Sequence, residues 1–103
     1  MILGKVTGTL WGARQSQGLQ GRKLVQVRPV KLSGLVPGRP MGNDVSDDIL
    51  SGDVIVAVDA LNADEGQLVL IGIGSRVRDI TVGTDCPTKA VVVAIVDAVQ
   101  REV

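Results

Sequence analysis

Between residues 53 and 99 the chain carries three blocks of Val, Ile and Leu, and these blocks limit the possible folds more than any other feature. Each block has the length and β-branched composition of a strand, and the segments between them are rich in turn-forming Gly, Asp and Asn. In the blocks over 54–58 and 91–96, apolar residues occupy both alternating positions. A strand that is apolar on both faces is covered on both faces. One face fills a core, and in a chain of 103 residues we expect the other to contact a second copy of the chain.

Two further strands are expected before these blocks, over 1–11 and 22–30, because both segments alternate polar and apolar residues. Between them and the blocks lies 31–52, which contains Pro, Gly and an acidic second half. We interpret this segment as a solvated loop, with charge pairing between neighbouring subunits as the alternative. The pattern predicts one all-β domain over 1–103, a small closed barrel of five or six strands with at most a short helical turn at Pro87. Closure removes the exposed edges that valine-rich strands otherwise present.

The composition argues against several classes of function. Eleven basic and eleven acidic residues give no net charge, which disfavours a surface that follows nucleic-acid phosphates. The chain has no His, the usual base near neutral pH, and we expect no catalytic residues, no cofactor and no metal site. Its single cysteine, Cys86, excludes an internal disulfide and is interpreted as a structural or incidental thiol. No apolar run is long enough for a membrane helix, and nothing resembles a signal peptide, so a cytoplasmic protein is expected.

Three short patterns are candidates for chemistry. The run that begins Gly72-Ile73-Gly74 lacks the third glycine and the βαβ setting of a dinucleotide loop. The acidic run over 43–48 lacks the spacing of a calcium loop. Asp59 and Asp97 each follow an apolar run, so they are either buried carboxylates, with the arginines at 76 and 78 as candidate partners, or simple caps at strand ends.

Several motifs, in this order and spacing, resemble the bacterial microcompartment vertex family of the EutN/CcmL type. They are Gly4 to Thr9, Gly21 to Val27, Val56-Ala57-Val58-Asp59, Gly66 to Leu70, Gly74-Ser75-Arg76-Val77-Arg78, Pro87 and Ala94 to Asp97. The resemblance covers nearly the whole chain. The chain departs from the family pattern at Asn62-Ala63-Asp64, at Arg76 and Val77, after Pro87, in the length of 31–52 and at the C-terminal end.

The resemblance implies an oligonucleotide-binding-like (OB-like) barrel that forms a homopentamer, fills the vertices of a shell of hexameric proteins in the cytoplasm, and is not an enzyme. It places a pore or subunit interface at the following residues: Gly74, Ser75, Arg76, Arg78, Asp59 and Asn62. An arginine repeated around a ring favours anions, so Arg76 is expected to make the pore or its rim more positive. The alternative function is an OB-like single-stranded nucleic-acid-binding module. The lack of Phe and Tyr, the single Trp and the zero net charge argue against it.

Overall fold

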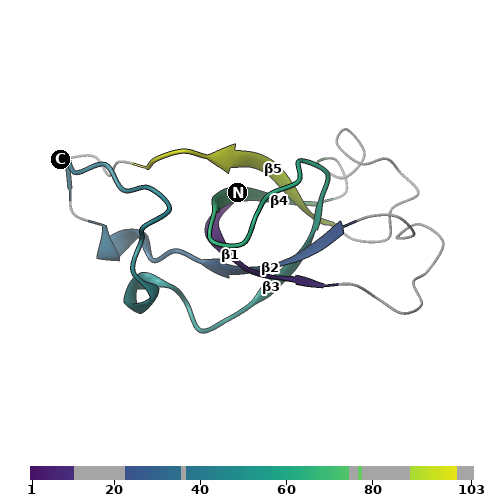
Figure 1. Ribbon diagram of the computed structural model, residues 1–103, viewed down its shortest axis with the longest axis horizontal. Coiled ribbons are helices and arrows are strands. Elements are labelled where there is room, and N and C mark those ends of the chain that lie inside the picture. The colour runs from purple at the N-terminus through teal and green to yellow at the C-terminus, as the bar shows by residue number, and fades with distance from the viewer. Residues whose placement is uncertain (11–22, 36, 75–76, 78–88, 100–103) are drawn as a thin grey trace.

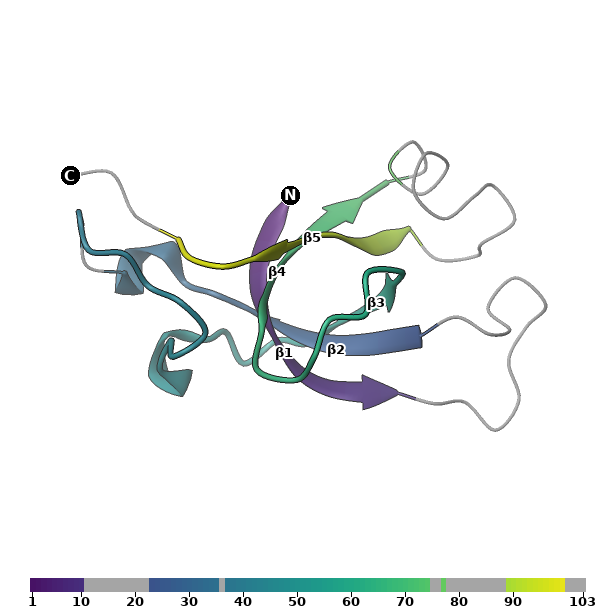
Figure 2. The ribbon, with the colours of Figure 1, turned by 45° about the horizontal axis from the view of Figure 1, so that its top comes forward.

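The computed structural model describes residues 1–10, 23–35, 37–74, 77 and 89–99. Five strands form a closed barrel in the order β1-β2-β3-β5-β4 (Figures 1 and 2). Their bounds are β1 Ile2–Leu10, β2 Lys23–Pro29, β3 Ile55–Asp59, β4 Leu68–Ile73 and β5 Ala90–Val96. The helical elements with described bounds are short 3-10 turns, η2 (Leu32–Gly34) and η3 (Asp47–Ile49). The helical turn expected at Pro87 lies outside the described residues.

The pairing is that of a small Greek-key barrel. All neighbouring strands are antiparallel except β3 and β5, which run parallel and meet at Val58 and Val91. β1 pairs with β2 on one side and with β4 on the other, from Ile2 opposite Ile71 to Lys5 opposite Leu68. Five strands in this arrangement match the OB-type barrel. The predicted fold class, a small closed all-β barrel, is therefore confirmed.

A β-bulge in β1 changes which side chains face the core. The register with β2 shifts between Val6 and Gly8, so Val6 points into the barrel, whereas Leu10 lies on the surface with 38% of its area exposed. A bulge inserts one extra residue and reverses the alternation beyond it. Regular alternation along 1–11 would put Val6 and Leu10 on one face, and the bulge is the reason that they lie on different faces.

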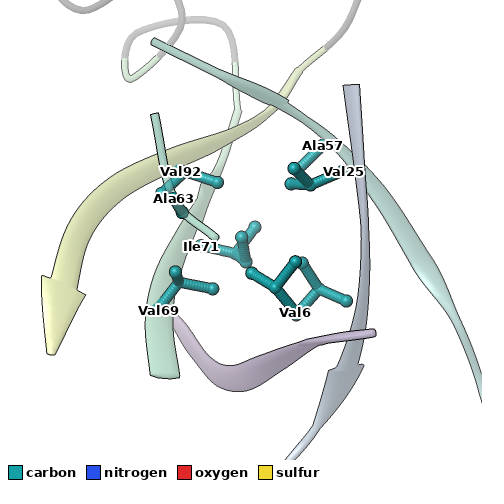
Figure 3. Close-up of a cluster of buried hydrophobic side chains, with 8 residues drawn as sticks. Val6, Val25, Ala57, Ala63, Val69, Ile71 and Val92 are labelled. Carbon is teal, nitrogen blue, oxygen red and sulfur yellow. The ribbon is translucent and has the colours of Figure 1, made fainter. Parts of the chain in front are cut away.

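Small aliphatic side chains fill the barrel interior (Figure 3). The buried residues of this core are Val6, Val25, Val27, Ala57, Ala63, Val69, Ile71 and Val92. Tight packing leaves no room for a side chain at Gly4, where an added Cβ would collide with Val27 and approach the Arg28 carbonyl oxygen to 3.1 Å. A second pair, Val58 and Val91, is buried on the other face of β3 and β5 and packs against Leu24. The prediction that these strands are apolar and covered on both faces is met at this pair.

The segment 31–52 is a folded lobe, which corrects its interpretation as a solvated loop. Its apolar side chains form a second core with the barrel, with Leu35, Val45 and Leu50 each 3% exposed or less. Antiparallel bridges tie it down, Val30 to Leu50 and Met41 to Val99. Its charged side chains do remain exposed. The lobe and the C-terminal end of β5 lie together on the left of Figure 1.

Candidate interface site

The turn between β3 and β4 is built around one buried carboxylate. Asp59 ends β3 with its side chain fully buried. Its two oxygens accept hydrogen bonds from the backbone N–H groups of Leu61, at 2.9 Å, and Ala63, at 2.6 Å. A buried charge needs such partners, and two backbone donors plus a cation supply them here.

The cation is Lys23, at the start of β2 and opposite Asp59 in the sheet. Its Nζ lies 3.7 Å from Asp59 Oδ2 and donates a 2.6 Å hydrogen bond to the carbonyl oxygen of Ala63. It also donates a 3.4 Å hydrogen bond to Oδ1 of Asn62. Asn62 has φ of 60°, a left-handed conformation that Asn tolerates better than most residues. Asp59 and Asn62, both predicted as interface residues, therefore meet in one turn and act there as turn-forming residues.

The sequence pattern does not identify Lys23. The candidate partners that it gives for the carboxylates, the arginines at 76 and 78, lie outside the described residues. Of the two candidate buried carboxylates, Asp97 is exposed, which leaves for it the alternative of a cap at a strand end. The signal for Lys23 is its register: once β2 pairs antiparallel with β3, the first residue of β2 faces the last residue of β3. The alternation pattern alone does not give that register.

Gly74 is the described part of the predicted pore segment. It follows β4 with φ of 130°, a conformation open essentially to Gly, and its N–H donates to the Lys89 carbonyl oxygen at 3.0 Å. Two residues earlier, Gly72 makes room for Val77, whose Cγ1 lies 2.6 Å from where a Cβ would stand. Gly72 and Gly74 therefore fix how the chain leaves β4. Ser75, Arg76 and Arg78 lie outside the described residues, and their assignment to a pore or interface stays a prediction.

A shallow hollow of about 380 Å³ lies over β1 and β2, lined by side chains of both charges. Its cations already have partners. Lys5 donates to the Val45 carbonyl oxygen at 3.1 Å and lies 3.9 Å from an Asp47 oxygen, while Arg28 Nε donates to the Ser51 carbonyl oxygen at 2.8 Å. These contacts join the lobe to the barrel, so the hollow lies along the boundary between the lobe and the barrel.

The described part of the chain holds no cluster of candidate metal ligands. Within those ranges, no three carboxylate or thiol side chains lie close enough to share a metal ion. The same ranges contain no helix with the length and apolar character needed to cross a membrane. The site is thus defined by its fold: an apolar barrel whose β3–β4 turn is held by hydrogen bonds, with Val54, Val56, Ile73 and Ile95 exposed.

Comparison with known proteins identifies the family. Residues 1–97 match the family model described as ethanolamine utilisation protein EutN/carboxysome. The shell vertex protein PduN of Salmonella typhimurium is 36% identical over 97 residues, which cover 94% of this chain and 96% of PduN. The shell vertex protein GrpN of Rhodospirillum rubrum is 32% identical over 97% of both chains. This chain therefore belongs to the EutN/CcmL family, as the motifs predicted.

Solved structures agree with this assignment. The structure of GrpN, a pentameric microcompartment shell protein, covers all of both chains with 28% identity and a TM-score of 0.71. The structure of CcmL from Nostoc sp. PCC 7120 is 29% identical, with a TM-score of 0.73, over 93% of this chain and 88% of CcmL. The barrel and its lobe thus correspond to the fold of these shell proteins.

Proposed function

We propose that this protein is a non-enzymatic shell subunit, five copies of which form a ring at a vertex of a bacterial microcompartment. The observation that carries the proposal is the family match over residues 1–97, together with relatives that are shell vertex proteins. The barrel suits this role because its outer face exposes Val54 and Val56, each by 46% or more. Apolar patches of this kind mark interfaces. A cyclic ring uses one such interface at every contact, so a modest patch closes it.

The proposed neighbours in the shell are hexameric proteins, and the proposed location is the shell in the bacterial cytoplasm. A closed polyhedral surface tiled with hexagons needs pentagonal corners, and a five-membered ring supplies them. The alternative, a single-stranded nucleic-acid-binding module, finds no support in the relatives named above. It also lacks the aromatic platforms on which bases stack, since the chain has no Phe or Tyr and one Trp.

The mass of the purified assembly tests the proposal. Five chains of 10.7 kDa give a ring of about 54 kDa, which native mass spectrometry separates from a monomer. We expect the ring to be the main species at micromolar concentration. Co-expression with a hexameric shell protein then tests the vertex role: closed particles should form only when this chain is present. A folded monomer at all concentrations would contradict the proposal.

A further inference from the structure

An apolar row crosses the outside of the barrel, and only part of it is covered. Residues that lie directly opposite each other in a sheet point to the same face, and Leu10 of β1 lies opposite Leu24 of β2. Leu24 in turn lies opposite Val58 of β3, and Val58 lies opposite Val91 of β5. Val58 and Val91 are 1% and 0% exposed. Exposure rises along the row towards β1, where Leu24 is half-buried and Leu10 is 38% exposed.

A second row lies beside the first on β1, β2 and β3. Gly8 lies opposite Gln26, and Gln26 lies opposite Val56. Val56 precedes Val58 by two residues, so it points to the same face, and it is 46% exposed. The three strands lie side by side in both views (Figures 1 and 2). The uncovered parts of the two rows form one surface, here called the outer sheet face, which consists of Gly8, Leu10, Leu24, Gln26 and Val56.

The outer sheet face contains no charged residue. The polar group at its centre, the Gln26 amide, has a partner in the same chain, because its Nε2 donates a 3.3 Å hydrogen bond to Thr7 Oγ1. The next pair on this side of β1 and β2 is Lys5 and Arg28, and both donate to carbonyl oxygens of the lobe. An uncharged surface of this kind is best covered by another uncharged surface, because a charged partner would lose its hydration without gaining an ion pair.

We propose that the outer sheet face is one of the two surfaces through which each subunit contacts its neighbours, so that a second copy of the chain covers it. This inference rests on the proposed function and names a surface that forms the ring. Each contact in a cyclic ring joins two different surfaces, one from each subunit. Nucleic acids and acidic membranes bind through positive charge, which this face lacks. A second copy needs no such charge, and its docking would extend the apolar row that the chain already buries at Val58 and Val91.

A charge of nearly unchanged shape tests the assignment in the full-length protein. Gln26→Glu keeps the size of the side chain and places a carboxylate at the centre of the outer sheet face. If a neighbour covers this face, the carboxylate is buried without a cation, and each contact should weaken by about a hundred-fold or more. Native mass spectrometry should then show monomers where the wild type shows rings, and circular dichroism checks that the variant is folded.

The matched control is Gln67→Glu, the same change in the β3–β4 turn. The side-chain oxygen of Gln67 accepts the Asp64 N–H at 2.7 Å, and a carboxylate accepts it equally well. Gln67 lies outside the outer sheet face, so the rings of this variant should persist.

Footprinting measures whether the face itself is covered. Hydroxyl radicals label exposed side chains, and mass spectrometry of peptides compares wild-type rings with the Gln26→Glu monomer. Labelling of Leu10, Leu24 and Val56 should fall in the rings towards the level of Val58, which is already buried in the single chain. If Gln26→Glu does not fold, Leu10→Ala supplies the monomer, since loss of this apolar contact should weaken each interface by about ten-fold.

Each outcome separates the two claims. Rings that persist in Gln26→Glu, equal ring loss in Gln26→Glu and Gln67→Glu, or unchanged labelling of the outer sheet face would overturn the assignment of this surface while the proposed function stands. A wild-type protein that never forms rings would overturn both.

Discussion

Asp59 is the one charged residue among the described residues that is buried, with 4% of its area exposed. It holds the turn after β3 by accepting two backbone N–H groups and by its ion pair with Lys23. Its position directly after an apolar run predicts a buried carboxylate or a strand cap, and the structure shows that it is both. Its partner, Lys23, is the first residue of the neighbouring strand β2. Only the register between β2 and β3, which are far apart in the sequence, brings the two side chains together.

The variant Asp59→Ala should show what this carboxylate contributes. It leaves the N–H groups of Leu61 and the buried Ala63 without an acceptor and Lys23 without its counter-charge, so we expect the free energy of unfolding to fall by about 2–4 kcal/mol. Urea denaturation at one fixed protein concentration measures the change, since assembly adds to apparent stability. Asp64→Ala, an exposed carboxylate in the same turn, is the control and should change stability by less than about 0.5 kcal/mol. Equal effects of the two variants would show that burial of Asp59 does not matter.

At the scale of elements, the five strands were predictable and the lobe was not. Alternation and β-branched composition place the strands, because each strand has a face that must be buried. In the lobe, Leu35, Val45 and Leu50 recur at no helical or strand spacing, yet all three are buried. They are buried because β1, β4 and the C-terminal end of β5 offer Leu3, Leu68 and Val96 at one end of the barrel. That surface exists only after the barrel has formed, so no local pattern reveals it.

Leu50→Ala should loosen the lobe more than the barrel. Removing this 3% exposed side chain should lower the free energy of unfolding by about 2–4 kcal/mol. Hydrogen exchange should rise first at the amides of Lys31, Met41 and Ser51, whose bonds hold the lobe. The matched control is Leu32→Ala, the same change in the same lobe at a side chain that is 58% exposed. If exchange rose equally in β2 and in the lobe, the lobe would not be a separate unit of stability.

At the scale of the whole molecule, apolar faces on both sides of a strand predicted contacts with identical copies, and the family match supports a ring. Which residues line its axis was predicted from motif resemblance alone. Gly74 leaves β4 in a conformation suited to Gly. Ser75, Arg76 and Arg78 lie beyond the described residues, so their position in a pore remains a proposal.

Arg76→Ser is expected to reduce anion preference across the assembled shell. An arginine repeated at every subunit concentrates positive charge at the axis, and its loss should lower the ratio of anion to cation flux several-fold. Flux of small ions of either sign into purified shells measures the ratio. Arg39→Ser removes an exposed arginine of the lobe and serves as the control. An unchanged ratio would place Arg76 away from the pore.

The pairing of β1 with β4 has a consequence for how the protein is made. Ile2 and Leu3 pair with Ile71 and Leu70, so during synthesis β1 cannot complete its pairing until β4 has left the ribosome. Pairing between strands far apart in the sequence slows folding and leaves apolar segments exposed to solvent until it is complete. The barrel therefore cannot close until β4 and β5 have been made. Any surface that spans these strands, including one that a neighbouring copy would contact, exists only after that point.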